Sequence, residues 1–200
     1  IVFVVDDDAA VRHSLALLIR SMSLEVELFE SAASFLDRCD ENCTGCVLLD
    51  LRMPGMSGME LPQALDDKGL SLPIIFVTGH GSVQMAVQAM RRGAVDFLQK
   101  PFDDQELLDR INQALDLDRS NRQLRRDLAA TRARLDKLTP RERQVMERIV
   151  HGQANKVIAA ELSLSARTVE LHRAKVMTKT GTSSLAELVA MVTKLNSESA

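Results

Sequence analysis

The sequence has none of the long apolar segments that a membrane span requires. Its 200 residues include no Trp and no Tyr, and 46% of them are hydrophobic while 26% are charged. No apolar run approaches the roughly 20 residues of a transmembrane helix, and no basic and apolar signal segment precedes the first apolar run. We therefore expect a globular, cytoplasmic protein without a membrane partner, long enough for one large domain or two modest ones.

Cysteine is also scarce, and the three present are Cys39, Cys43 and Cys46. The C-x3-C-x2-C spacing raises the question of a metal site, but zinc needs a fourth ligand, and no nearby His or Cys supplies one. Cys46 opens an apolar run, where a thiol behaves as a small core residue. The sequence therefore favours unpaired thiols in a reducing compartment over a metal centre.

The net charge of -3 conceals a sharp division along the chain. Residues 1–118 contain 20 acidic and 9 basic side chains, a balance of -11, and residues 119–200 contain 8 acidic and 16 basic ones, a balance of +8. A basic segment attracts nucleic acid, which an acidic segment repels. The asymmetry predicts two domains with different partners, and the alternative is an ordinary solvated surface.

Short apolar runs alternate with helical patterns in the first part of the chain. Apolar strands separated by helices indicate βαβ units and a parallel sheet covered on both faces. The pattern predicts an α/β doubly wound, five-stranded parallel sheet whose site lies at the C-terminal ends of the strands. The expected strands are 1–5, 25–29, 46–50, 73–78 and 94–98.

The second part shows no strand pattern. Pro and Gly are absent from residues 103–136, which predicts a long helix, and four short helix patterns follow it. We expect an α/β domain over 1–118, a helical linker over 119–137 and an all-α domain over 138–200.

Leucines recur along the linker helix at heptad spacing. Such a seam predicts either a helix that pairs with another chain or a single charged helix lying on its own domain. Leu117, Leu124 and Leu138 share one heptad position, Leu128 and Leu135 share the other, and Asn121 and Thr131 interrupt the seam.

Polar residues follow the expected strands at one edge of the sheet. Asp6 and Asp7 follow the first strand, Asp50 ends the third, Thr78 ends the fourth and Lys100 follows the fifth. Carboxylates so close together repel one another unless a cation joins them, and Mg²⁺ readily bridges carboxylates to phosphate oxygens. Asp50 would then be the attacking carboxylate of aspartyl-phosphate chemistry, and the alternative is a polar loop with a helix cap.

Four short motifs follow one another in this part of the chain: VVDDD (4–8), LLDLRMPGMSG (48–58), VTGHG (77–81) and DFLQKPF (96–102). In order and spacing they resemble the receiver domains of two-component response regulators, across essentially all of residues 1–118. The stretch TGHGSVQMAVQAMRRGAVDF is similar to the FixJ-type subgroup. The resemblance implies a flavodoxin-like fold in which Asp50 accepts a phosphoryl group from a sensor histidine kinase.

The same resemblance implies a metal site around Asp50. Mg²⁺, or Mn²⁺ in its place, would be held by the carboxylates of Asp6, Asp7 and Asp50 and by the main-chain carbonyl of Arg52. Arg52 and His80 occupy positions that tune the lifetime of the phosphoryl group in the family.

The resemblance further implies a switch. Thr78 and Lys100 would contact the phosphoryl group, and Phe97 would turn inward as Thr78 moves, although Phe97 also suits plain core packing. Phosphorylation would then favour a homodimer formed through helix 82–93 and strand 94–98.

A haloacid-dehalogenase-type phosphatase is the alternative of a different class. Such enzymes also place an Asp nucleophile, Mg²⁺, a Thr and a Lys on a doubly wound sheet, and Asp6 and Asp8 offer their D-x-D spacing. That family needs a further acidic pair at a strand end after the Lys, whereas Asp103 and Asp104 open a helix here. The sequence favours a protein that is not an enzyme beyond its own Mg²⁺-dependent aspartyl phosphorylation and dephosphorylation.

The stretch NKVIAAELSLSARTVELHRAKVMTKTG (155–181) has the pattern of a helix, a short turn and a second helix. Ser165 suits the N-cap of the second helix, and Val169 and Val176 mark its inward face. A small, apolar and basic outward face suits a DNA major groove, and the alternative is a solvated amphipathic helix. The outward residues at about 100° per residue are Arg167, Leu171, Ala174, Lys175 and Thr178.

Residues 138–195 resemble the LuxR/NarL-type four-helix DNA-binding domain. The resemblance implies a recognition helix over 165–179 and a transcription regulator, more typically an activator, with promoter DNA and RNA polymerase as partners. An output domain that contacts protein is the alternative. Many members carry Lys where this chain has Glu170, which suggests a contact to a cytosine amino group or an orienting role for Arg167 or Arg173. The implied DNA contacts are Glu170, Leu171 and Ala174 at bases, Lys156, Arg173, Lys175 and Lys179 at phosphates, and Arg167 and Thr168 beside them.

Overall fold

The computed structural model describes residues 1–79 and 83–197. Contacts divide the chain into two compact units, Ile1–Arg122 and Gln123–Ala200. His80 lies outside the described residues, as does Ser82 at the start of the helix expected over 82–93.

The first unit is built on a parallel sheet of five strands in the order β2-β1-β3-β4-β5. This order confirms the predicted doubly wound architecture, since the chain crosses from one side of β1 to the other between β2 and β3. Observed and predicted boundaries differ by one or two residues, with β5 beginning later than expected. The strands are β1 (Val2–Val5), β2 (Val26–Phe29), β3 (Cys46–Leu49), β4 (Ile74–Thr78) and β5 (Asp96–Gln99).

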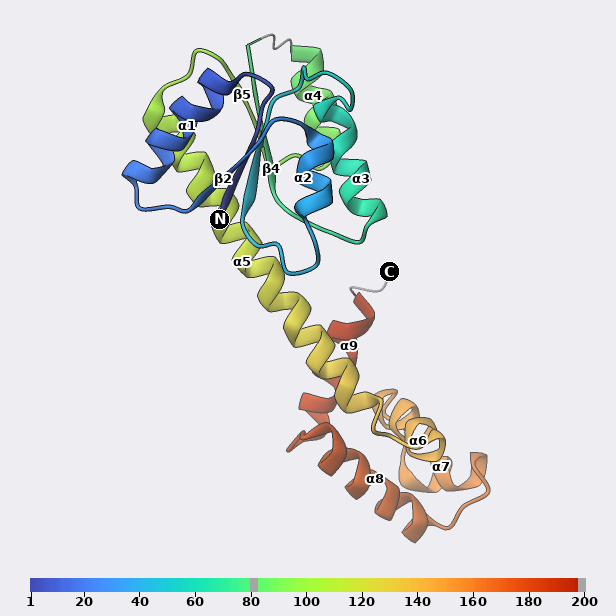
Figure 1. Cartoon of the computed structure of the whole chain (residues 1–200). Helices are drawn as coiled ribbons and strands as arrows, with labels where there is room; N and C mark the ends of the chain where they lie inside the picture. The colour runs from blue at the N-terminus through green and yellow to red at the C-terminus, as the bar shows by residue number, and fades with distance from the viewer. Residues whose placement is uncertain (80–82, 198–200) are drawn as a thin grey trace. The chain divides into compact units, whose positions relative to one another are not determined.

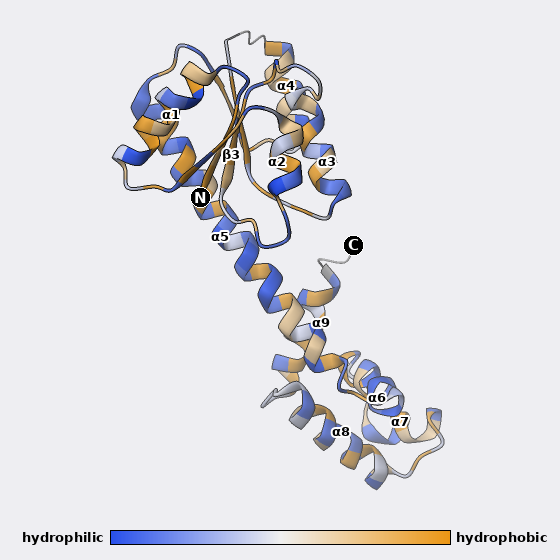
Figure 2. Cartoon of the chain, in the orientation of Figure 1, coloured by the Kyte–Doolittle hydropathy of each residue, from blue (hydrophilic) through white to orange (hydrophobic). Residues whose placement is uncertain are grey.

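Helices cover both faces of the sheet (Figure 1). Alternate residues of a strand point to opposite faces, so Val2 and Val4 pack with α1 and α5, while Phe3 and Val5 pack with α2, α3 and α4. Figure 2 shows the strands as the apolar centre of this unit, with hydrophilic segments on the helices around them. The helices are α1 (Ala9–Ser21), α2 (Ala32–Arg38), η1 (Gly58–Glu60), α3 (Leu61–Asp67), α4 (Val83–Arg91) and α5 (Asp104–Leu135).

Helix α5 is the long helix expected from the absence of Pro and Gly. The Asp103 side chain caps its start by accepting hydrogen bonds from the backbone N–H groups of Gln105 and Glu106, at 2.9 and 3.1 Å. Its last part, from Gln123 onward, belongs to the second unit, where Leu135 is buried.

The described residues of the second unit, 123–197, form four further helices, as predicted. They surround a core of aliphatic side chains that includes Leu135, Leu138 and Ile158. Ser165 caps α8 by accepting from the Thr168 N–H at 3.0 Å, and Gly181 ends that helix at φ 69°, a left-handed conformation that favours glycine. The helices are α6 (Pro140–Val150), α7 (Asn155–Glu161), α8 (Ala166–Thr180) and α9 (Leu185–Ser197).

The three cysteines are free thiols, and Cys46 is fully buried in β3, which confirms its predicted place in the core. Burial raises the pKa of the Cys46 thiol to about 12. Across residues 1–79 and 83–197, no helix has the length and apolar character needed to cross a bilayer.

Candidate functional site

The predicted polar residues meet at the C-terminal edge of the parallel sheet. Lys100, which follows β5, places its Nζ 2.7 Å from Asp6 Oδ2 and 3.8 Å from Asp50 Oδ1. These residues lie far apart in the chain, and the order β1-β3-β4-β5 brings the strand ends that carry them side by side. The edge therefore combines two carboxylates with one ammonium group.

Asp50, the predicted nucleophile, is buried at this edge, with 9% of its surface exposed. Its Oδ2 accepts a hydrogen bond from the Arg52 N–H at 2.9 Å. Burial raises the pKa of Asp50, the Arg52 N–H and Lys100 oppose the rise, and the charges of Asp6 and Asp7 add to it. A carboxylate perturbed by both burial and neighbouring charges is typical of a functional site.

Asp6 and its two acidic neighbours have separate positions. Asp6 is buried, and its Oδ1 accepts from the Asp8 N–H at 2.9 Å. Asp8 caps α1 by accepting from the Ala10 N–H at 2.8 Å, so this residue of the acidic segment serves as a helix cap. Asp7 is exposed beside them.

Hard oxygen donors at this edge suit a divalent cation such as Mg²⁺. The chemical fit is good, because three carboxylates, Asp6, Asp7 and Asp50, lie near one ammonium group, that of Lys100, and the charges of Asp6 and Asp7 raise the pKa of Asp50. The side chains do not form a ready-made chelate: within the described residues, no group of three or more His, Cys, Asp or Glu is arranged to hold a metal ion.

Thr78 lies on β4, the neighbour of β3, and Phe97 lies on β5, the neighbour of β4. Thr78 is 1% exposed at the end of β4, and its carbonyl accepts from the Lys100 N–H at 2.8 Å. Phe97 in β5 is half-buried against the core of the α2, α3 and α4 face. Thr78 is thus at the acidic edge, whereas Phe97 pairs with Phe76 near the start of β5 and contributes to packing.

The loop after Asp50 contains a steric requirement that the sequence patterns do not predict. A Cβ at Gly58 would lie 2.2 Å from the main-chain oxygen of Asp50, so only glycine fits there. The Gly58 N–H donates to the Leu51 carbonyl at 3.2 Å, and Ser57 and Glu60 close a capping box over the same turn. The segment MPGMSG therefore folds back against the backbone that carries Asp50.

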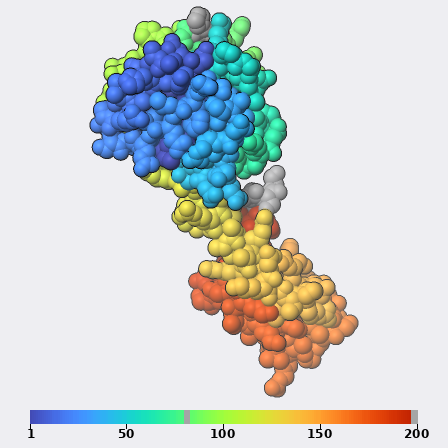
Figure 3. All heavy atoms as spheres, in the orientation of Figure 1, coloured from blue at the N-terminus to red at the C-terminus, as the bar shows by residue number. Residues whose placement is uncertain are grey.

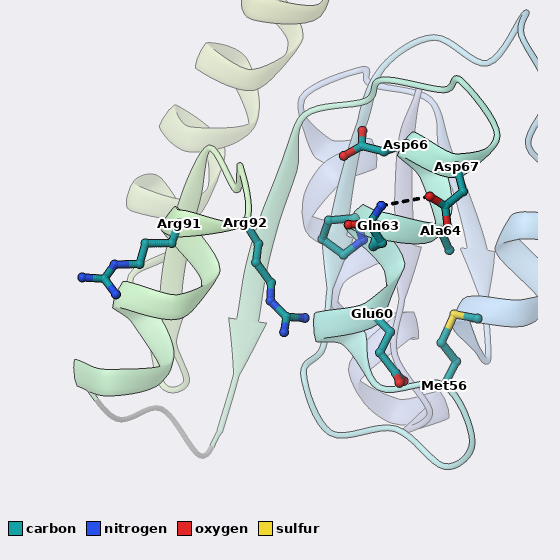
Figure 4. Close-up of a pocket in the computed structure, with 9 residues that line it drawn as sticks. Met56, Glu60, Gln63, Ala64, Asp66, Asp67, Arg91 and Arg92 are labelled. Carbon is teal, nitrogen blue, oxygen red and sulfur yellow. Dashed lines mark hydrogen bonds between the residues drawn. The ribbon is translucent and has the colours of Figure 1, made fainter.

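A cavity of about 960 Å³ lies beside α3 and the end of α4 (Figure 4). Arg92 extends from the end of α4 toward α3 and donates to the Met59 carbonyl at 2.6 Å. The lining of the cavity includes none of the predicted site residues, so the cavity is a separate feature from the acidic edge. The lining residues are Met56, Glu60, Pro62, Gln63, Ala64, Asp66, Asp67, Arg91 and Arg92.

The second candidate site is α8. Val169 and Val176 are fully buried, whereas Leu171 is 58% exposed, as the helical pattern predicted. The remaining residues of the predicted outward face, Arg167, Ala174, Lys175 and Thr178, are exposed, as are Glu170 on α8 and Lys156 on α7. Thr168 is half-buried at the start of the helix, where its hydroxyl pairs with that of Ser165 at 2.8 Å.

Two of the predicted phosphate contacts have partners inside the unit. Arg173 donates to Asn155 Oδ1 on α7 at 3.2 Å, so Asn155 orients this guanidinium group. Lys179 Nζ lies 2.6 Å from Glu142 Oε2, and Glu142 is 3% exposed at the start of α6. Both partners lie far away in the sequence, and no local pattern signals them.

The Lys179–Glu142 pair makes the second unit sensitive to acid. Hydrogen bonds from Lys179 and from the Thr139 N–H lower the pKa of Glu142 to about 2, from 4.5. A lowered folded-state pKa means that the stabilisation is present above pH 4.5 and is lost as the pH falls from 4.5 toward 2.

We expect Glu142→Gln to lower the thermal midpoint at pH 7, because the variant lacks the charge that pairs with Lys179. The difference in thermal midpoint between the variant and wild type should disappear as the pH falls from 4.5 toward 2, measured by circular dichroism. Glu147→Gln, an exposed control on the same helix, should match wild type; an equal loss in both variants would contradict the assignment.

An acidic edge on a doubly wound sheet, followed by a helix-turn-helix unit, defines a response regulator with a DNA-binding output. Residues 2–112 match the response regulator receiver domain, and residues 136–192 match the bacterial regulatory proteins of the luxR family. The chain therefore belongs to the response regulators that join a receiver to a LuxR-type domain.

Named relatives and a solved structure agree with this assignment. The chain is 48% identical over 192 residues to the transcriptional regulatory protein FixJ of Azorhizobium caulinodans, covering 95% of this chain and 90% of the relative. It is 46% identical over 198 residues to the transcriptional regulatory protein TdiR of Thauera aromatica, covering 96% and 84%. The structure of the response regulator StyR matches with a TM-score of 0.85 at 46% identity, covering 96% of this chain and 98% of that one.

These matches confirm the predicted resemblance and the class of function. The chain is a transcription regulator of the phosphorylation-dependent response regulator family, which is not a family of catalytic enzymes. They decide against the phosphatase alternative, and the LuxR-type match favours DNA over protein as the partner of the output domain.

Proposed function

We propose that Asp50 is the phosphoacceptor and that its phosphorylation controls DNA binding by α8. The observation that carries this is the buried Asp50 carboxylate, with Lys100 Nζ 3.8 Å from Oδ1 and the Arg52 N–H on Oδ2. In this proposal residues 1–118 are the receiver, 119–137 the linker and 138–200 the DNA-binding domain.

An Asp50 oxygen attacks the phosphorus of the donor, and the bond from phosphorus to the donor's leaving group breaks as the new O–P bond forms. Lys100 stabilises the charge on the transferred phosphoryl oxygens, because an ammonium group in a shielded site acts strongly on developing charge. Thr78 offers a hydroxyl to the phosphoryl group at the same edge. As Thr78 moves toward that group, the half-buried Phe97 turns inward.

Receiver domains use Mg²⁺ in phosphorylation. In this chain the carboxylates of Asp6, Asp7 and Asp50 and the main-chain carbonyl of Arg52 would hold it. When bound, the ion would neutralise charge shared between these carboxylates and the phosphoryl oxygens.

The receiver implies a sensor histidine kinase as donor, and the LuxR-type domain implies promoter DNA as target. In α8, we assign base contacts to Glu170, Leu171 and Ala174, and phosphate contacts to Lys175. Arg173 reaches phosphate from the position that its hydrogen bond to Asn155 sets. Lys179 is a further phosphate contact, and its ammonium group is paired with Glu142. Arg167, Thr168 and Lys156 complete the set. Activation through RNA polymerase and a cytoplasmic location belong to the same proposal.

A phosphorylation-dependent homodimer through α4 and β5 would bring two α8 helices to two half-sites. Its support is an apolar surface on α4, where Val83 is 82%, Val87 46% and Met90 48% exposed. We expect acetyl phosphate with Mg²⁺ to convert wild type to a dimer in analytical ultracentrifugation. Val87→Asp should stay monomeric, because dimerisation would bury an unpaired charge, and should still become phosphorylated.

Leu17→Asp is the matched control, since Leu17 is 57% exposed on α1. This variant should dimerise like wild type. A phosphorylated wild type that remains monomeric, or a Val87→Asp variant that dimerises normally, would contradict the α4 surface.

A further inference from the structure

Most basic side chains of the helix-turn-helix region are already used inside the protein. Residues 138–200 contain nine basic and six acidic residues, a balance of only +3. Within the described part of the chain, five of these nine basic side chains form hydrogen bonds or ion pairs with other residues of the same unit. The pairs are Arg141 with the Leu162 carbonyl, Arg143 with Asp136, Arg148 with Glu161, Arg173 with Asn155 and Lys179 with Glu142.

The end of α5 and the residues after it supply further positive charge, and part of it, on Arg126, Arg134 and Lys137, is not used in this way in the part of the chain that the structure describes. Residues 123–137 contain five basic and two acidic residues, so these 15 residues also carry +3. Of the two acidic side chains, Asp136 pairs with Arg143 and Asp127 accepts from Gln123 Nε2 at 2.9 Å. The charge density of this segment is therefore several times that of the domain that follows it.

Two of these basic residues share one side of the helix, and a third follows in the turn after it. At about 100° per residue, Arg126 and Arg134 lie about 80° apart, with Ala130 between them and Ala133 beside Arg126. Lys137 lies two residues past the end of α5 at Leu135. All five are exposed, and Figure 3 shows the yellow atoms of the α5 segment on the open surface in that view. In the described residues, no side-chain hydrogen bond or ion pair engages the three basic groups. We call Arg126 and Arg134 the basic face of α5.

The basic face is attached to the unit that contains α8. Leu135 is 4% exposed in the core of that unit, and its carbonyl accepts from Arg143 Nη2 at 3.1 Å. A Cβ built at Gly181, the residue that ends α8, would lie 4.0 Å from Arg134 Nη1. Arg134 thus lies beside the C-terminal end of α8. Gly181 follows Lys175 by six residues, which is about 9 Å along the helix axis at 1.5 Å per residue.

We propose that the basic face of α5 binds the phosphate backbone of the DNA next to the groove that α8 enters. The inference rests on the proposed DNA-binding role of α8 and adds a second contact surface to it. Exposed arginines suit phosphate oxygens, and the small alanines between them let the backbone approach closely. Such contacts carry no sequence information but fix the register and raise affinity through counterion release.

The test measures the salt dependence of binding to a fluorescent duplex of random sequence, with the full chain treated with acetyl phosphate and Mg²⁺. The slope of log affinity against log salt changes by about 0.9 for each phosphate that the protein no longer neutralises. We expect Arg126→Gln with Arg134→Gln to make the slope shallower by about 2. Arg119→Gln is the matched control, because Arg119 lies on the same helix in the first unit and pairs with Asp116 at 2.7 Å; its slope should equal that of wild type.

Three results separate this proposal from the general function. A double variant with the wild-type slope, or with a uniformly weaker affinity at an unchanged slope, would overturn the basic face as a phosphate-binding surface. A wild type that binds no duplex would overturn the DNA-binding role of α8 as well. Equal helix content by circular dichroism in all variants establishes that the comparison is between folded proteins.

Discussion

Asp50→Asn is expected to abolish phosphorylation of the protein by acetyl phosphate. The amide is nearly the same size as the carboxylate and keeps an oxygen for the Arg52 N–H, but it lacks the nucleophilic carboxylate that attacks phosphorus. Incorporation of radioactive phosphate from labelled acetyl phosphate with Mg²⁺ measures the effect. We expect stoichiometric labelling of wild type and no labelling above background in the variant, because no carboxylate remains there to attack phosphorus.

The same variant should remain folded. Because burial and the neighbouring charges of Asp6 and Asp7 raise the pKa of Asp50, the ionised carboxylate costs stability at pH 7, and a neutral amide removes that cost. The thermal midpoint of Asp50→Asn should therefore not fall below that of wild type. Asp37→Asn, at an exposed position on α2, is the control and should be labelled normally. Equal labelling of Asp50→Asn and wild type would remove Asp50 from the mechanism.

Arg167→Ala combined with Lys175→Ala is expected to destroy specific DNA binding. Both side chains are exposed on the outward face of α8, opposite the buried Val169 and Val176, so their removal leaves the core intact. Removing a side chain that contacts a base costs about 1–3 kcal/mol, and removing one that contacts phosphate weakens binding to every sequence, so the two losses together should weaken binding by at least about 5-fold. The measurement is affinity for a duplex selected from random sequences by the wild-type chain.

Glu170→Ala should behave differently from that double variant. Removal of a base-reading side chain relaxes the preference at one base pair, whereas removal of a phosphate-binding side chain weakens binding to all sequences alike. Lys194→Ala, which removes a positive charge from α9, should keep both affinity and preference. If the Arg167→Ala, Lys175→Ala chain bound the selected duplex as wild type does, α8 would not be the recognition helix.

Local patterns were sufficient to predict the strands, the long α5 and the acidic edge. In a parallel sheet every strand ends at the same side, so Asp6, Asp50, Thr78 and Lys100 could be placed together before any contact was known. The inward and outward faces of α8 also followed directly from helical periodicity. The strands and helix faces depend on side-chain periods of two residues in a strand and 3.6 in a helix, and both periods can be read directly from the sequence.

The features that could not be predicted depend on pairs distant in the chain. Glu142 has the position of a capping-box residue, but its ion pair with Lys179 joins two helices that only the folded unit brings together. The closeness of Gly58 to the Asp50 carbonyl is likewise a consequence of how the loop folds back. Strand β5 begins at Asp96, two residues after the start of the apolar run, because its pairing with β4 starts at Ile75 and Asp96.

The leucine seam of the linker has a divided outcome. Leu135 and Leu138 are buried in the second unit, so the end of the seam serves that unit's own core. Leu117 is 40% exposed on the earlier part of α5. Periodicity alone could not separate these uses, since both require the same leucine spacing.

The central claim is that phosphorylation of Asp50 controls DNA binding. Its most direct test is the affinity of the full chain for the selected duplex before and after treatment with acetyl phosphate and Mg²⁺, measured side by side for wild type and Asp50→Asn. We predict that wild type tightens by about 5–150-fold, the usual range of coupling between two sites, and that Asp50→Asn binds equally before and after treatment. A wild type that does not respond, or an Asp50→Asn variant that responds as wild type does, would contradict the claim.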